Sequence, residues 1–366
     1  MNQIKVAIIG GGINSTIGNA HYFSMRLDGG FDIVSGFFSR NSKINVKSAK
    51  YLKINSSRVY NNFKELILTE KSNVDFFLVL TPTSSHFEIL KFLINQKVNI
   101  ICEKPIVSDL YEAKIIKKLL RNYSKKFITI FNYTGYPAVR EIKEIIKRKK
   151  IGRIISFNFK MPQETFVKNN IQSIQKWRLI DKTLPTITQD LTVHLINLIF
   201  FIFKTKPKKV ISYYSQNFNH LKVKDDCKSI LVFSNFSGTI WVSKSALGEK
   251  NGLSLEIYGE RGSVVWRQSD NENLVISYKT GETKIINRSC KTYEMSKPRY
   301  QRYRPGHPSG FIEAFSNYYT DIKIFFMTNK SRYLSNFNDG YQAIEILNYL
   351  SLSNKKQKWI EIEKKT

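Results

Sequence analysis

The sequence predicts an α/β protein in which a doubly wound, Rossmann-type parallel sheet is followed by an α+β domain with an open, mainly antiparallel sheet. The first 135 residues alternate short apolar runs with helical patterns, which is typical of parallel strands joined by crossover helices. Beyond them, strand patterns follow one another with few helices between, which favours antiparallel pairing. A glycine triplet also follows the first apolar run directly. We therefore divide the chain into residues 1–135 and residues 136–366.

Each element follows from a local pattern. Buried apolar runs predict the strands of the first domain at 4–9, 31–38, 74–80, 98–102 and 127–131, and helical patterns cover 16–27, 63–68, 86–95 and 110–122. In the second domain a helix over 138–149 precedes strands at 154–160, 210–217, 229–233, 239–245, 253–258 and 263–267, and a helical stretch over 190–203 interrupts that series. Two last helical patterns, 311–327 and 339–351, could pack back on the first domain.

The composition is that of a globular protein. Of the 366 residues, 42% are hydrophobic and 24% are charged, which excludes a disordered or collagen-like chain. The longest apolar run, 195–203, is less than half of a membrane span, so we expect no membrane partner. The 58 basic and 29 acidic residues give a net charge of +29, but the densest runs are short. Proteins that bind nucleic acid cluster their charge. The spread therefore favours anionic metabolites and cofactor phosphates over nucleic acid.

The cysteines and the N-terminus indicate the cellular compartment. Cys102, Cys227 and Cys290 form no C-x-x-C pair and would leave one unpaired thiol, which favours a reducing compartment without structural zinc or another bound metal. The first residues enter a strand directly and lack the pattern of a signal peptide. We therefore expect a cytoplasmic protein.

The glycine triplet predicts a dinucleotide-binding turn. Residues without side chains at the end of the first strand let backbone N–H groups at the start of the next helix approach a pyrophosphate. The spacing departs from G-x-G-x-x-G because Ser15 holds the third position and the next glycine is Gly18, which could lengthen the loop. A plain strand-to-helix turn is the alternative. The residues expected to contact the cofactor here are Gly10, Gly12, Ile13, Asn14 and Ile17.

The end of the second strand bears on the choice between NAD and NADP. An acidic residue usually hydrogen-bonds the ribose of NAD at this point, and this chain has Ser39-Arg40-Asn41 instead. Arg40 and Ser39 can hold a 2′-phosphate, so NADP is modestly favoured and NAD is retained. The alternative for Arg40 is a solvated loop residue.

Polar residues follow three further strands of the parallel series, where ligands of doubly wound sheets bind. These segments are Thr81-Pro82 with His86, Glu103-Lys104-Pro105, and Asn132-Tyr133. In the second domain Asp190 and His194 stand at i and i+4 of a predicted helix and so share one face. A carboxylate beside an imidazole can orient it and stabilise its protonated form. Taken alone, an ordinary pair on a helix face is the alternative.

In this order and spacing, these motifs resemble the glucose-fructose oxidoreductase, inositol dehydrogenase and rhizopine-catabolism (Gfo/Idh/MocA) family of NAD(P)-dependent oxidoreductases. The resemblance covers nearly the whole chain, and Glu103-Lys104-Pro105 is its most specific element. The family often has glycines before and within the motif from Asp190 to His194, where this chain has residues 186–189 and Thr192. That difference concerns the shape of the substrate pocket.

The resemblance implies roles for individual residues. Lys104 would hydrogen-bond the reacting oxygen, His194 would accept its proton, and Asp190 would orient or charge the imidazole. It further implies cofactor contacts from Thr81, Pro82, His86, Glu103, Lys104 and Asn132, and substrate contacts from Lys104, Tyr133, Trp177, Arg178, Asp190, His194 and His307. It also implies a homodimer or homotetramer built on the open sheet.

Several of these residues also have simpler interpretations. Trp177 and Arg178 could be a packed aromatic with a surface guanidinium, Asn132 and Tyr133 could only end a strand, and His307 could belong to a turn. His21 is expected to cap or pack the first helix. The predicted function is reversible oxidation of a hydroxyl on a sugar, cyclitol or sugar derivative. The alternatives are a non-catalytic regulator that senses the nucleotide and a glycoside-cleaving enzyme that uses NAD for transient oxidation.

Overall fold

The computed structural model describes residues 3–167, 175–218 and 221–362. The chain divides into two compact units. One comprises residues 1–135 and 311–342, and the other comprises residues 136–310 and 343–366. The second unit is thus interrupted in sequence by a segment that belongs to the first.

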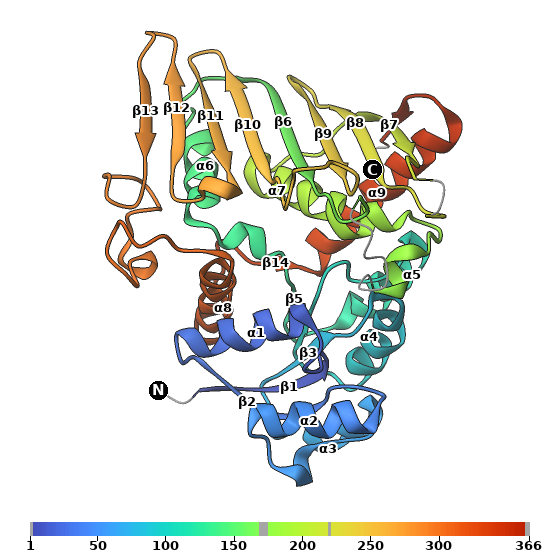
Figure 1. The fold of residues 1–366 in the computed structure, drawn as a ribbon. Helices are drawn as coiled ribbons and strands as arrows, with labels where there is room; N and C mark the ends of the chain where they lie inside the picture. Colours follow the sequence, from blue (N-terminus) through green and yellow to red (C-terminus); the bar gives the residue numbers. More distant parts are fainter. Residues whose placement is uncertain (1–2, 168–174, 219–220, 363–366) are drawn as a thin grey trace. The chain divides into compact units, whose positions relative to one another are not determined.

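The first unit is built on a six-stranded sheet in the order β14-β5-β4-β3-β1-β2. Five strands are parallel and β14 is antiparallel at the edge, with bounds β1 Ile4–Gly10, β2 Phe31–Phe37, β3 Phe76–Leu80, β4 Ile100–Cys102, β5 Phe127–Thr129 and β14 Ser335–Asn336. The helices of this unit are α1 Thr16–Leu27, α2 Ser42–Leu52, α3 Phe63–Glu70, α4 His86–Asn95, α5 Leu110–Leu119 and α8 Phe311–Thr328. Helices α1 and α8 lie together on one face of the sheet, and α2 and α3 lie on the other (Figure 1). The predicted doubly wound sheet is confirmed.

Helix α2 was not predicted, because its buried face carries little apolar signal. That face includes Asn45 and Ser48 beside Ala49 and Leu52. Asn45 can be buried there because its side chain accepts a hydrogen bond from the Phe38 amide and donates one to the Tyr60 carbonyl. The helix is therefore held by polar contacts that a hydrophobic pattern does not reveal.

Helix α8 belongs to the first unit because it supplies part of that unit's core. Phe315, Tyr318, Tyr319 and Ile322 are buried in the hydrophobic cluster formed by the parallel strands and α1. The division based on sequence placed this segment within 136–366 but expected that it could pack back on the first domain. These four apolar side chains recur at helical spacing, and this explains why the helix packs on the first sheet.

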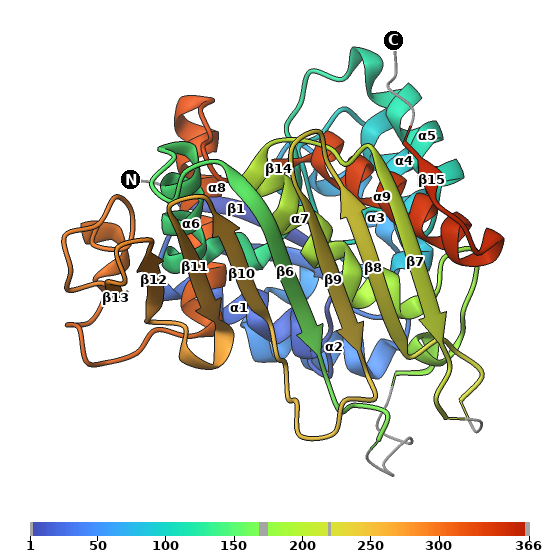
Figure 2. The ribbon, with the colours of Figure 1, turned by 90° about the horizontal axis from the view of Figure 1, so that it is seen from above.

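The second unit contains a nine-stranded sheet in the order β13-β12-β11-β10-β6-β9-β8-β7-β15. All neighbours pair antiparallel except β6 and β9. Its strands are β6 Ile154–Pro162, β7 Lys209–Ser215, β8 Asp226–Val232, β9 Ser237–Ser243, β10 Ser254–Gly259, β11 Gly262–Arg267, β12 Leu274–Tyr278, β13 Thr283–Ile286 and β15 Ile360–Glu361. Helices α6 Pro137–Lys147 and α7 Val193–Phe203 lie on one face (Figure 2), and α9 spans Phe337–Lys356. The predicted open sheet is confirmed.

None of the helices in the described part of the chain combines the length and the apolar content that a bilayer-crossing segment needs.

Candidate functional site

The turn after β1 requires glycine at two consecutive positions. Gly10 and Gly11 have φ of +90° and +65°, which side-chain-bearing residues rarely adopt. A Cβ on Gly10 would lie 2.7 Å from the Thr81 amide nitrogen at the end of β3. The Gly11 carbonyl accepts a hydrogen bond from the Tyr22 hydroxyl of α1. The turn therefore lies directly against β3 and is anchored by the helix that follows it.

Gly18 provides the close approach that the third glycine of the usual motif would provide. Helix α1 begins at Thr16, and its N-cap Ser15 accepts the Gly18 amide at 3.1 Å. A Cβ on Gly18 would lie 2.4 Å from the Gly11 carbonyl oxygen, so only glycine allows this contact between the helix and the turn. The shift of three residues in sequence thus retains the packing of helix on turn.

The carboxyl ends of the parallel strands hold polar atoms suited to a ligand. The Thr81 Oγ1 and the Asn132 Nδ2 are buried and have no hydrogen-bond partner among the residues that the structure describes. Buried polar atoms are nearly always paired, so such atoms indicate a bound group or water. Together with the glycine turn at the N-terminus of α1, they fit a dinucleotide at this edge of the sheet.

The other predicted cofactor residues near the turn differ in exposure. Asn14 is exposed, Ile17 packs against the core, and the Ile13 amide donates to the Ser48 hydroxyl at 2.9 Å. Beyond β2, Ser39 is half-buried and its hydroxyl accepts the Asn41 amide at 3.1 Å, while Arg40 is exposed.

His86 joins the segments that follow β3 and β4. Its ring nitrogens lie 2.8 Å from the Thr81 carbonyl oxygen and 2.9 Å from the Pro105 carbonyl oxygen, and the residue is buried. Burial lowers the pKa of His86 despite the carbonyl oxygens, which act in the opposite direction. Each ring nitrogen thus lies against a backbone carbonyl oxygen, and His86 packs between the segments that carry Thr81 and Pro105.

Glu103 and Lys104 follow β4, which lies between the strands that lead to Thr81 and Asn132. The Lys104-Pro105 peptide bond is cis. One Glu103 carboxylate oxygen accepts the Lys104 amide at 3.0 Å, and the other lies 2.9 Å from the His21 Nε2. The other nitrogen of His21 lies 2.5 Å from the Tyr319 hydroxyl, and His21, Glu103 and Tyr319 are all buried.

His21 and Tyr319 therefore support the backbone of Lys104 through Glu103. From the sequence, His21 was expected only to cap or pack the first helix, and Tyr319, 298 residues further along the chain, was not singled out. No local pattern could have found this pair, because only the packing of α8 on α1 brings the two residues together.

Asp190 and His194 lie where a π-helix passes into an α-helix. Thr188–Thr192 is a π-helix and α7 begins at Val193, whereas the sequence predicted one regular helix over 190–203. Such local widening is frequent at functional sites. Both side chains are buried. The Asp190 Oδ2 lies 2.6 Å from the Lys244 Nζ and 3.3 Å from an Arg178 guanidinium nitrogen.

Arg178 thus forms an ion pair with Asp190, so its guanidinium is not solely a solvated surface group. Its guanidinium also lies over the ring of Trp177, with 4.9 Å to the centroid. The sequence motifs did not point to Lys244, although the strand alternation contains a signal for it. It continues the inward-facing series Gly238, Ile240 and Val242 of β9, where a lysine is unexpected.

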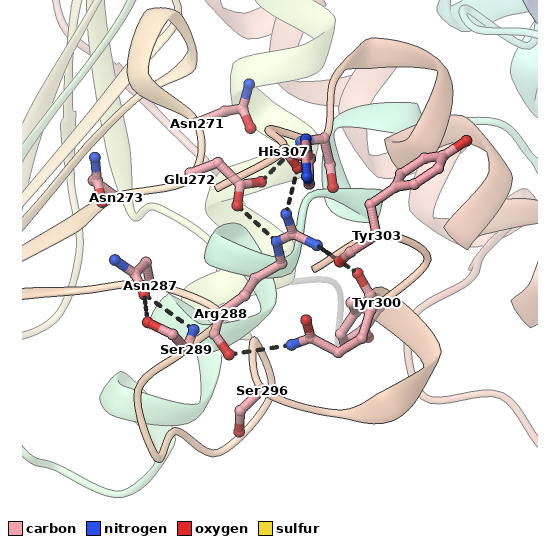
Figure 3. Close-up of polar contacts among 12 residues, drawn as sticks. Asn271, Glu272, Asn273, Asn287, Arg288, Ser289, Ser296, Tyr300, Tyr303 and His307 are labelled. Atoms are coloured by element: carbon pink, nitrogen blue, oxygen red, sulfur yellow. Dashed lines mark hydrogen bonds and ion pairs between the residues drawn. The ribbon is translucent and has the colours of Figure 1, made fainter. Parts of the chain in front are cut away.

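The remaining predicted substrate residues are Tyr133 and His307. Tyr133 is buried beside Phe311 within the first unit. His307 is exposed, and its carbonyl accepts a hydrogen bond from Arg288 at 2.8 Å (Figure 3). Arg288 is itself paired with Glu272 at 2.6 Å, so this buried arginine organises the loop that carries His307.

The two family models that match the chain are those of an oxidoreductase with an NAD-binding Rossmann domain and a C-terminal alpha/beta domain. The chain belongs to the Gfo/Idh/MocA oxidoreductase family, as its sequence motifs predicted. Residues 4–131 match the family model described as the NAD-binding Rossmann fold, and residues 143–362 match the C-terminal alpha/beta domain of the same family.

Three known proteins illustrate this similarity. The chain is 23% identical to the uncharacterized oxidoreductase YfiI of Bacillus subtilis over 88% of this chain and 85% of that protein. It is 21% identical to a levoglucosan dehydrogenase of Pseudarthrobacter phenanthrenivorans over 99% of each chain. The crystal structure of an inositol dehydrogenase homologue from Azotobacter vinelandii, complexed with NADH and myo-inositol, superimposes with a TM-score of 0.88. It shares 19% identity over 99% of this chain and 98% of that one.

Proposed function

We propose that this protein is a dehydrogenase or reductase for a secondary hydroxyl or ketone of a sugar, a cyclitol or a sugar derivative. The placement of Lys104 carries the proposal. Lys104 follows β4, and the two strands that flank β4 lead to Thr81 and Asn132, whose buried polar atoms lack partners in the described part of the chain. The levoglucosan and inositol dehydrogenases among the similar proteins support this substrate class.

In the proposed mechanism, a bound nicotinamide dinucleotide supplies the hydride acceptor or donor. The glycine turn from Gly10 to Gly12 and the N-terminus of α1 hold its pyrophosphate. Lys104 donates a hydrogen bond to the reacting oxygen and stabilises the negative charge that develops there. His194 accepts the proton of the alcohol, and Asp190 orients the imidazole.

The segment that follows β2 supports a modest preference for NADP over NAD. No carboxylate stands at its end, and the exposed Arg40 offers a guanidinium to a 2′-phosphate. NAD remains an accepted cofactor in this proposal.

We also propose self-association through the open face of the nine-stranded sheet. Tyr213, Ile230 and Tyr258 project from β7, β8 and β10 with 58%, 41% and 37% of their surface exposed. Exposed apolar groups gathered on one face commonly mark an interface. A homodimer or homotetramer is expected, and light scattering tests it.

We propose a cytoplasmic location as well. Cys102, Cys227 and Cys290 are all free thiols, which fits a reducing compartment.

The test is a spectrophotometric screen of sugars, inositols and nucleotide sugars with NAD and NADP. On a substrate so identified, Lys104→Ala should lower kcat by about 100-fold or more, because it removes a donor to the reacting oxygen. Nucleotide affinity should persist. Lys91→Ala, which removes a half-buried lysine paired with Glu88, is the control and should leave kcat unchanged.

Unchanged turnover in Lys104→Ala would remove Lys104 from the mechanism. Nucleotide binding without turnover of any substrate would favour the regulator. Sugar release without a change in nicotinamide absorbance, accompanied by exchange of a substrate C–H with solvent, would favour the glycoside-cleaving enzyme.

A further inference from the structure

Lys244, directly after β9, is a buried lysine whose side chain is only 1% exposed. An ammonium group is almost never fully buried unless it is paired, because its removal from water costs several kcal/mol. The Lys244 Nζ lies 2.6 Å from the Asp190 Oδ2 and 5.1 Å from the centre of the Phe166 ring. The contact with Asp190 is short and charge-assisted.

Two backbone hydrogen bonds just beyond the ends of the strands hold this lysine in place. The Lys244 amide donates to the Asp225 carbonyl at 2.8 Å, and the Lys244 carbonyl accepts the Phe166 amide at 2.8 Å. The amide and the carbonyl of Lys244 are thus both hydrogen-bonded, which fixes the position of its Cα and so the base of the side chain. Arg178, the second cation on Asp190, differs because it lies on a short 3-10 segment with 32% of its side chain exposed and contacts Asp190 at 3.3 Å. Lys244 is therefore the closer and more rigid of the two cations.

These contacts bear on which group accepts the proton. Two cations beside one carboxylate favour its ionised form and oppose its protonation. A carboxylate held in that state is a poor proton acceptor, but it can still hold a neighbouring group in place.

We propose that Lys244 is a positioning residue that holds Asp190 as a fixed anion in one orientation, so that His194 and not Asp190 takes the proton. The inference rests on the proposed function. In the oxidation step the hydroxyl proton passes to an imidazole nitrogen of His194, and a bound nicotinamide would accept the hydride from the carbon that bears this hydroxyl. Lys244 keeps its own proton throughout and does not contact the substrate.

The first test is Lys244→Met, which keeps most of the side-chain volume and removes the charge. We expect kcat to fall by about 100-fold, because a misplaced catalytic group has effects of that size. The KM for the sugar should change much less, and NAD(P) affinity should be unchanged. Lys206→Met is the matched control. It removes a lysine from another ion pair of the same unit, with Glu345 at 3.1 Å, and should leave kcat unaltered.

Two further measurements separate positioning from stability. Methylammonium or ethylammonium should restore turnover to Lys244→Ala, whereas the matching alcohols should not, because the missing element is a cation. In an Asp190→Asn background, Lys244→Met should have almost no additional effect on kcat. The double variant also removes both buried charges, so it should fold even if the single variant does not.

The outcomes distinguish this inference from the proposed function. If the wild-type chain turns over a sugar and Lys244→Met does so equally well, the assignment of Lys244 is wrong and the proposed function stands. A fall in kcat that no ammonium ion restores, and that adds fully to the effect of Asp190→Asn, would make Lys244 a structural residue only. A wild-type chain without dehydrogenase activity overturns the proposed function, and this inference with it.

Discussion

Gly18→Ala tests whether the close packing of α1 against Gly11 fixes the conformation of the glycine turn. An alanine Cβ would lie 2.4 Å from the Gly11 carbonyl oxygen, 2.9 Å from its carbonyl carbon and 3.0 Å from its Cα. These are backbone atoms that cannot rotate away, so the turn or the helix must shift. Overpacking of this kind costs ~1–3 kcal/mol. The better helix propensity of alanine returns at most ~1 kcal/mol.

We therefore expect the free energy of unfolding to fall by about 1–2 kcal/mol, which corresponds to a Tm lower by roughly 2–8 °C. Because the displaced turn is the proposed pyrophosphate site, nucleotide affinity should fall by about tenfold, the equivalent of ~1.4 kcal/mol. Scanning calorimetry measures the first effect and titration calorimetry with NAD and NADP the second.

Gly30→Ala is the control for this experiment. Its Cβ would meet only the side chain of Lys323, at 3.1 Å from the Cδ, and that flexible chain can move. This variant should melt and bind nucleotide like the wild type. If Gly18→Ala also behaves like the wild type, the tight packing of α1 on the turn is not needed, and the role assigned to Gly18 is wrong.

Two further substitutions test the cofactor preference and the support of Lys104. Arg40→Ala should shift the ratio of kcat/KM for NADP over NAD toward NAD by about tenfold, since it removes a charged donor to the 2′-phosphate; an unchanged ratio would make Arg40 a solvated loop residue. Tyr319→Phe should cost ~1 kcal/mol of stability and lower kcat severalfold, because it loosens His21 and thereby Glu103. Tyr318→Phe, which loses a buried hydrogen bond to the Thr129 carbonyl, is its matched control and should lower Tm without lowering kcat. Equal kcat in the two tyrosine variants would contradict the proposed support.

The motifs that could be predicted are those in which neighbouring residues carry the signal. The glycine turn, Glu103-Lys104-Pro105 and the spacing from Asp190 to His194 were visible because each motif occupies a few consecutive positions. Helix α2 escaped prediction because its buried face depends on polar groups such as Asn45. The π-helix before α7 also escaped, since its residues do not distinguish it from a regular helix.

By itself, the sequence determined the fold class, the family and the strand ends that carry the predicted site residues, because periodicity and motif spacing are local properties of a chain. Only the tertiary structure decided which partners those residues have. Tyr319 reaches His21, and Lys244 reaches Asp190, across long stretches of chain. Burial makes such contacts strong, and burial is decided by how helices and sheets pack, which no short segment of sequence specifies.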